Sequence, residues 1–231
     1  MAYCPFLPYM KCPYYWDNRV DLTDENSEER QEKFSFIRFL HASPNAPAID
    51  IYINEKKAVS NLPYGSLAGY AALPASLHKI ETYPAGQTAD PLLSIPIPLG
   101  EDTFTTMIIA GLLPSLQYRI YRDMKENIST NESYIRFVHL SPRAPAVDIV
   151  LETGETLFSS ITFGRTEQYK KINPGIYKLL VRASGTPNVV LDLPHLTFEG
   201  GKAYTIYAIG LLGGSPPLSA VVLTDGRHIS F

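Results

Sequence analysis

Apolar and polar residues alternate with a period of two along most of the chain after residue 33. The segments Phe34–His41, Ile49–Ile53 and Thr103–Ile109 are rich in β-branched and aromatic residues, and turns that contain proline or glycine bound them. Such alternation predicts half-buried β-strands. No stretch carries apolar residues at helical spacing over three turns, and the frequent prolines would interrupt a long helix. The pattern therefore predicts an all-β protein.

The strand pattern occurs twice. Ile37–Ile51 reads IRFLHASPNAPAIDI and Ile135–Ile149 reads IRFVHLSPRAPAVDI, with eleven of the fifteen positions identical. Further landmarks recur at nearly the same offset, namely Gly65 and Gly164, Tyr70 and Tyr169, Gly86 and Gly185, and Gly111 and Gly210. A unit of about 95 residues with seven or eight short strands is typical of a Greek-key-like β-sandwich. We expect a tail and linker at 1–33, sandwiches at 34–125 and 134–231, and a linker at 126–133, with the second sandwich able to fold alone.

The repeated block H-x-S-P-x-A-P-x-x-D resembles the bacterial family known as domain of unknown function 4397. The resemblance covers residues 36–123 and 134–225. It implies immunoglobulin-like sandwiches, often in tandem and often on exported or cell-surface proteins. It implies no catalytic residue and no cofactor. The expected fold is therefore two tandem immunoglobulin-like (Greek-key) sandwiches after an extended tail.

Charge and hydropathy exclude two classes of partner. The formal net charge is −3 with a pI of about 6.0, and no basic stripe suggests nucleic-acid binding. No apolar run approaches the roughly 18 residues of a membrane span, so we expect no membrane insertion. Met1–Trp16 lacks the apolar core of a signal peptide, which predicts synthesis in the cytoplasm without one. Its Tyr/Pro/Cys-rich composition resembles that of endospore coat and appendage proteins, which suggests deposition on a spore or cell surface.

The first sixteen residues form an aromatic tail that holds both cysteines of the chain. Residues 17–32 follow with seven acidic and two basic side chains, a net charge of −5. This acidic segment is either a solvated linker or a segment that docks on a neighbouring subunit. So short a tail has no core for its own aromatic rings, and exposed apolar segments are interaction sites. We expect a homo-oligomer or polymer whose assembly and cross-linking residues are Cys4, Phe6, Tyr9, Cys12, Tyr14, Tyr15 and Trp16.

Each unit pairs a histidine with an aspartate nine residues later: His41 with Asp50, and His139 with Asp148. A His–Asp pair can serve base catalysis or metal binding. Neither unit repeats a third catalytic member, and one histidine with one carboxylate is too few for structural zinc. We expect the histidines to bond to the backbone of the following proline turn, with the aspartates as their partners or as turn caps. No catalytic residue, metal or cofactor is predicted.

Two further predictions concern surfaces. Arg38 and Arg136 occupy equivalent strand positions and are expected on a solvent-facing side. The prolines of 91–98 predict an edge strand more irregular than its counterpart at 189–193.

The sequence favours a non-enzymatic structural protein that assembles through its tail. The alternative is a carbohydrate- or polymer-binding adhesion module with a surface polysaccharide as partner, using arginines and the tyrosines of the first unit (Tyr52, Tyr64, Tyr70, Tyr83, Tyr118 and Tyr121). A hydrolase that uses His41 or His139 is a third hypothesis. Aromatic residues clustered on an exposed face would favour the binding module, and tail residues buried in another chain would favour assembly.

Overall fold

A computed structural model describes residues 33–226, and this part of the chain contains sixteen β-strands. The strands form four sheets of four strands each, which confirms the all-β prediction. No helix in these residues is long and apolar enough to cross a membrane.

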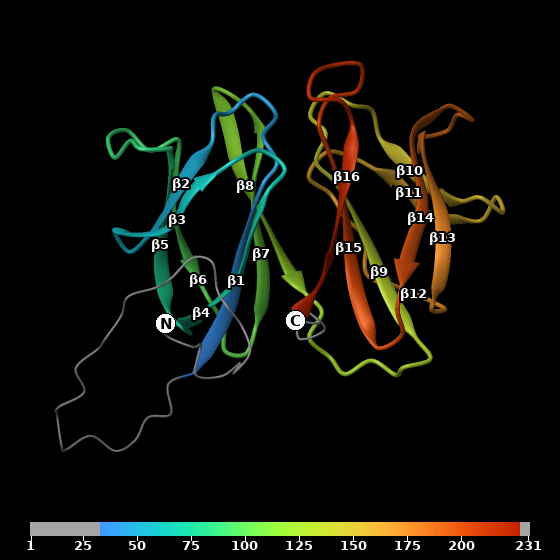
Figure 1. The fold of residues 1–231 in the computed structure, drawn as a ribbon, viewed down its shortest axis with the longest axis horizontal. Helices are drawn as coiled ribbons and strands as arrows, with labels where there is room; N and C mark the ends of the chain where they lie inside the picture. Colours follow the sequence, from blue (N-terminus) through green and yellow to red (C-terminus); the bar gives the residue numbers. More distant parts are fainter. Residues whose placement is uncertain (1–32, 227–231) are drawn as a thin grey trace.

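The first unit is a sandwich of two sheets (Figure 1). Its outer sheet has the order β3-β2-β5-β6 and its inner sheet the order β4-β1-β7-β8. Strand β1 pairs in parallel with β7 and antiparallel with β4. The strands are β1 (Phe34–His41), β2 (Ile49–Ile53), β3 (Lys56–Leu62), β4 (Leu67–Pro74), β5 (Leu77–Pro84), β6 (Leu93–Pro98), β7 (Phe104–Leu112) and β8 (Ser115–Asp123).

The second unit repeats this arrangement strand for strand. Its inner sheet has the order β12-β9-β15-β16 and its outer sheet the order β11-β10-β13-β14, with β9 parallel to β15. The strands are β9 (Ser133–His139), β10 (Val147–Leu151), β11 (Thr156–Ile161), β12 (Lys170–Ile172), β13 (Gly175–Ala183), β14 (Val189–Phe198), β15 (Lys202–Ile209) and β16 (Ser219–Thr224). The tandem-sandwich prediction is therefore confirmed.

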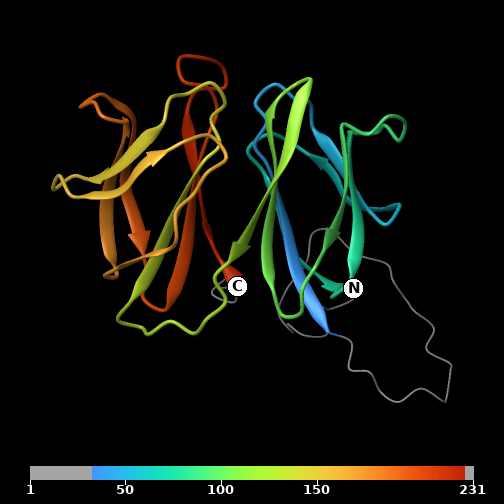
Figure 2. The ribbon, with the colours of Figure 1, turned by 180° about the vertical axis from the view of Figure 1, so that it is seen from behind.

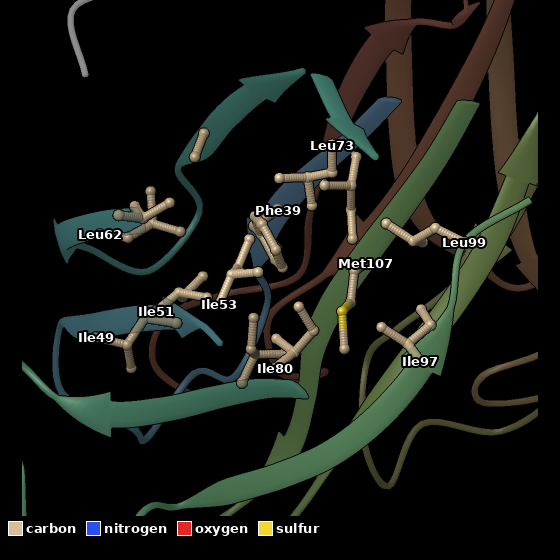
Figure 3. Close-up of a cluster of buried hydrophobic side chains, with 14 residues drawn as sticks. Phe39, Ile49, Ile51, Ile53, Leu62, Leu73, Ile80, Ile97, Leu99 and Met107 are labelled. Carbon is tan, nitrogen blue, oxygen red and sulfur yellow. The ribbon is translucent and has the colours of Figure 1, made fainter. Parts of the chain in front are cut away.

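Each unit has its own apolar core, because inward-facing residues alternate along its strands. In the first unit, Phe39, Ile51, Ile80 and Met107 pack between the two sheets (Figure 3). The equivalent cluster of the second unit includes Phe137. The core positions follow the period-two pattern of the sequence.

A third apolar cluster lies between the units and belongs to both. Leu40 and Ile108 of the first inner sheet pack with Val138 and Tyr207 of the second, and all four are fully buried. The two inner sheets therefore face each other, which agrees with their adjacent positions in both views (Figures 1 and 2). The second unit therefore has its own core and also shares buried residues with the first, and its ability to fold alone stays a prediction.

The proline-rich strand β6 is an edge strand, as its sequence indicates. Its ladder with β5 is nevertheless regular, whereas the β13–β14 ladder contains two register shifts. The prediction of a more irregular edge in the first unit is wrong. The amide of Leu99 donates to the carbonyl oxygen of Ser76 at 2.9 Å. In an antiparallel pair every second residue directs its amide toward the partner strand, so positions 95 and 97 face β5 and positions 96 and 98 face solvent. Proline has no amide hydrogen, and at positions 96 and 98 no hydrogen bond to β5 is lost.

Candidate functional site

The two repeated histidines are bound by the turns that follow them. Nε2 of His41 lies 2.9 Å from the carbonyl oxygen of Pro47, and the amide of Ser43 donates to Nδ1 at 3.3 Å. The equivalent distances at His139 are 3.0 and 3.2 Å. Burial lowers the pKa of both imidazoles. Each ring is therefore neutral, with both nitrogens engaged by backbone, and neither is free to act as a base or a metal ligand.

The repeated aspartates do not contact these histidines. Asp50 accepts hydrogen bonds from the amides of Asn61 and Gly86 at 2.8 and 3.0 Å and from Lys57 Nζ at 2.6 Å. Burial alone would raise the pKa of Asp50, but these bonds outweigh it and the pKa is lowered.

Asp148 has the same role in the second unit. It accepts from the amides of Ser160 and Gly185 at 2.7 and 3.2 Å and from Ser184 Oγ at 2.8 Å. Asp50 thus joins β2 to the loop after β5, and Asp148 joins β10 to the loop after β13. The suggested His–Asp partnership is absent from both units, because each imidazole is already saturated by its turn.

Four buried charges join the two units, and we call them the inter-unit ring: Arg38, Asp225, Arg136 and Asp123. The Arg38 guanidinium bonds to the Asp225 carboxylate, and the Arg136 guanidinium donates to Asp123 Oδ1 at 2.7 Å. The remaining neighbours in the ring, Arg38 with Asp123 and Arg136 with Asp225, are 3.7 and 3.9 Å apart. All four side chains are at most 5% exposed. Opposite charges therefore alternate around a closed, buried ring.

Hydroxyl groups complete the ring with the same bonds in both halves. Nε of each arginine donates to a threonine, Thr106 at 2.7 Å and Thr205 at 3.0 Å, and each threonine donates to the aspartate of its own unit. Tyr70 donates to Asp123 and Tyr169 to Asp225, each at 2.6 Å.

The two tyrosine rings also cover the guanidinium groups. Arg38 lies 4.6 Å from the ring centroid of Tyr70, and Arg136 lies 4.4 Å from that of Tyr169. The two units therefore contribute matching sets of one arginine, one threonine, one tyrosine and one aspartate.

This geometry corrects the expectation that Arg38 and Arg136 face solvent. They do lie on the side of the inner sheet away from their own core, but the other unit covers that side. Burial by itself disfavours a charged Arg38, but the combined effect of Asp225, Asp123 and the neighbouring Tyr207 and Tyr70 outweighs burial, so the pKa of Arg38 is raised. For Asp225, burial and the neighbouring Asp123 raise the pKa to about 6, against the opposing effect of Arg38. Because all four charges are paired within the ring, we interpret the ring as a structural contact that holds the two units together.

A second cluster lies on the exposed side of the outer sheet of the first unit, and we call it the tyrosine face: Tyr52, Lys57, Lys79, Glu81 and Tyr83. The tyrosine rings meet edge to face, with centroids 5.2 Å apart and planes at 74°. Lys57 Nζ lies 5.5 Å from the Tyr52 centroid. Lys79 pairs with Glu81 at 2.8 Å, and the Glu81 side chain is 9% exposed. Aromatic rings thus stand beside both signs of charge.

The second unit lacks this cluster. Strand register places Val150, Leu180 and Arg182 where the first unit has Tyr52, Glu81 and Tyr83. The two outer surfaces therefore differ chemically, although the sandwiches beneath them match.

The predicted assembly residues, from Cys4 to Trp16, lie outside the described residues. Within 33–226, no group of three or more histidine, cysteine, aspartate or glutamate side chains is placed to hold a metal ion. Sequence reasoning missed the ring aspartates Asp123 and Asp225. Each follows or ends the last strand of its unit, and this shared position was the available signal.

Comparisons with known proteins identify one family and no relative that informs function. The family model described as "Domain of unknown function (DUF4397)" matches residues 35–150, which run from the second residue of β1 through strand β9 and into strand β10. A search of curated proteins finds no significant match.

Three solved structures show distant likeness. The carbohydrate-binding module CBMbc (family CBM26) from Eubacterium rectale Amy13K, in complex with maltoheptaose, is 8% identical with a TM-score of 0.27, over 82% of this chain and 96% of that one. A leucine-rich repeat protein from Bacteroides thetaiotaomicron is 12% identical with a TM-score of 0.22, over 78% and 26%. The Bacillus anthracis TIE protein is 11% identical with a TM-score of 0.21, over 84% and 44%. At these TM-scores the likenesses are too weak to inform the function.

Proposed function

Because the chain belongs to the DUF4397 family, whose description assigns no activity, we propose a function from its structure: a non-enzymatic structural protein in which two fastened sandwiches carry a linking tail. We also infer that the second unit is a further copy of the family domain, since it repeats the first strand for strand. The site of assembly in this proposal is a spore or cell surface, which the Tyr/Pro/Cys-rich composition of the first sixteen residues supports.

The inter-unit ring is the observation that supports this proposal. Its four charged side chains and two threonines are buried, its two tyrosines are half-buried, and all eight are joined by hydrogen bonds or ion pairs. Groups that could have served an active site instead hold one sandwich against the other. The result suits a rigid building block.

The tail begins at a fixed point on this block. The carbonyl oxygen of Lys33 accepts from the amide of Ala75, and that of Phe34 accepts from the amide of Asp102, each at 2.7 Å. A tail rooted in this way can link copies, and Cys4 and Cys12 supply thiols that can cross-link the contacts after a neighbour is bound.

Sedimentation velocity and negative-stain electron microscopy test the proposal. The full chain should form oligomers or filaments, and a chain lacking residues 1–16 should be monomeric with an unchanged β-sheet circular-dichroism spectrum. Cys4→Ser with Cys12→Ser should preserve assembly and remove its resistance to denaturant. Full-length protein that stays monomeric under oxidising conditions, or a truncated chain that assembles equally well, would exclude tail-driven assembly.

The tyrosine face favours a second candidate function, binding of a surface polysaccharide. Sugar rings stack on aromatic faces, and flanking charged groups bond to hydroxyls. Affinity electrophoresis of the full chain through gels that contain soluble glucans would reveal this activity as retarded migration. Unretarded migration in every glucan would count against this candidate.

A further inference from the structure

We propose that a pocket in the first sandwich binds a small aromatic carboxylate. The pocket has a volume of about 250 Å³ and is lined from β6, β7 and β8, of which β6 and β8 are edge strands of the two sheets. An apolar cavity of about 150 Å³ is large enough for benzene, so this pocket has room for one substituted ring. The inference is independent of tail-driven assembly.

Apolar side chains from both sheets form the walls of the pocket. Ile97 and Leu99 line it from the side of the outer sheet, and each is 6% exposed. Ile120 lines it from the inner sheet and is 44% exposed, so the described chain leaves this wall partly uncovered. Binding pockets for small molecules are predominantly apolar in this way, with a few polar groups that fix the orientation of the ligand.

Arg122 supplies a positive charge to the pocket. It pairs with Thr105 in the β7–β8 ladder, and Thr105 stands two positions before the core residue Met107, so both side chains lie on the core-facing side of the inner sheet. The Arg122 guanidinium makes no hydrogen bond or ion pair with any residue of 33–226. One of its nitrogens lies 3.9 Å from the point at which a side chain on Gly100 would begin. A guanidinium in this state suits a carboxylate, which it can bind through two parallel N–H groups.

The second unit shows which groups fill the equivalent place. Tyr204 is the equivalent of Thr105, since each pairs with the same repeated isoleucine, in β9 and β1 respectively. Phe198 is likewise the equivalent of Leu99. The rings of Tyr204 and Phe198 lie 5.2 Å apart and are at most 7% exposed. The first unit has smaller side chains at both positions, and this difference accounts for the space in its pocket.

A backbone donor completes the comparison. In the second unit, the amide of Glu199 donates to the Tyr204 hydroxyl at 3.1 Å. Gly100 is the equivalent of Glu199 and lines the pocket, and its amide makes no hydrogen bond to a described residue. A ligand whose ring takes the place of the Tyr204 ring would bring its carboxylate to the Gly100 amide and the Arg122 guanidinium.

Saturation-transfer difference NMR of the full chain with benzoate tests the site, because this method observes the ligand and works for assembled protein. The benzoate signal should saturate with concentration. Acetate lacks the ring and benzyl alcohol lacks the charge, so each should bind about tenfold more weakly than benzoate or worse.

Two substitutions taken from the second unit locate the site. Thr105→Tyr places the filling ring in the pocket and should abolish benzoate binding. Arg122→Thr should weaken benzoate binding by about tenfold or more and leave benzyl alcohol binding unchanged, and it keeps the backbone carbonyl that accepts from Arg136. The matched control, Arg143→Asn, removes an equal charge from an exposed turn of the second unit and should leave benzoate binding unchanged. A circular-dichroism spectrum establishes that each variant is folded.

The outcomes separate this inference from the proposed function. A chain that gives no saturable benzoate signal removes the pocket assignment and leaves tail-driven assembly as it stands. Benzoate binding that survives in folded Thr105→Tyr or Arg122→Thr would place the ligand elsewhere and overturn the assignment. Equal affinity for acetate and benzoate would overturn the aromatic part of the ligand.

Discussion

Tyr207 occupies the position at which the first unit has Ile108, so its hydroxyl has no counterpart in the first unit. Strand register makes the two residues equivalent, since Ile108 pairs with Leu40 and Tyr207 with Val138. The Tyr207 hydroxyl is buried beside the inter-unit ring and has no hydrogen-bond partner among the described residues. A buried hydroxyl without a partner loses its bonds to water and gains nothing in return.

Tyr207→Phe should therefore raise the free energy of unfolding by about 1 kcal/mol, the lower end of the penalty for an unpaired polar group. Equilibrium urea denaturation measures the change. Tyr204→Phe is the matched control, because the Tyr204 hydroxyl accepts from the amide of Glu199 at 3.1 Å and its removal should be destabilising. A loss of stability in Tyr207→Phe would show that the hydroxyl has a partner.

The turn histidines predict a specific dependence of stability on pH. Burial lowers the pKa of His41 and His139 below the ordinary 6.5. The unfolded chain then binds protons that the folded chain does not, so their contribution is complete above pH 6.5 and falls as the pH drops below it. Replacing both by Gln, which can still donate to the turn carbonyl, should flatten the difference in unfolding free energy between pH 6.5 and 5.

Asp225 acts in the opposite direction over part of this range. Its pKa is raised to about 6 from 3.8, so its contribution is present below pH 3.8 and is lost as the pH rises through 6. The histidine effect is therefore read as the difference between wild type and His41→Gln, His139→Gln at each pH. Parallel curves for the two proteins would contradict the assignment of neutral histidines.

Strand β6 shows how an edge strand accommodates two prolines. The pairing of β6 with β5 has the same register as the hydrogen bond from Leu99 to Ser76. The amides of Ile95 and Ile97 therefore face β5, and the amide of Ser94 faces solvent, as do the nitrogens of the two prolines. Edge strands with prolines on the solvent side offer few donors to other chains.

Hydrogen exchange should reveal this alternation. We expect slow amide exchange at Ile95 and Ile97 and fast exchange at Ser94, with residue-level resolution by NMR. Slow exchange at Ser94 would mean that another strand covers this edge.

Sequence patterns located the best-alternating strands closely. The predicted bounds of β1 and β2 are those observed, because Ile37 and Phe39 of β1 and the three isoleucines of β2 face the core at alternate positions. Strands such as β3 and β12 have exposed polar residues and no clean alternation, and the sequence did not delimit them. The ring could not be predicted for a different reason. Period-two alternation shows that Arg38 points away from its own core, but not that a second sheet covers it.

At the scale of the molecule, the ring makes the two sandwiches interdependent. Arg136 of the second unit neutralises Asp123 of the first, and Arg38 does the same for Asp225. Removing one partner of a buried pair leaves a charge without compensation, at a cost of about 3–5 kcal/mol.

Arg136→Met should lower stability by this amount and affect both units together. Amide exchange in β5 and β13, which lie in opposite outer sheets, should accelerate by similar factors. Asp123→Asn added to Arg136→Met should recover part of the loss, because the stranded carboxylate is gone. Faster exchange confined to the second unit would show that the sandwiches unfold independently.

The matching halves of the ring also constrain how such a chain can evolve. Arg38 and Asp225 are 187 positions apart in the sequence, yet each carries the charge that the other needs. A substitution at one of them is therefore expected to be accepted only together with a compensating substitution at the other. A gene that lost one unit would leave the other with an arginine and an aspartate facing water across an apolar surface. Single-unit descendants should therefore either replace both charges or pair with a second polypeptide through the same contacts. In this chain, the tandem repeat places both units in one polypeptide, so the two units are always present in equal numbers.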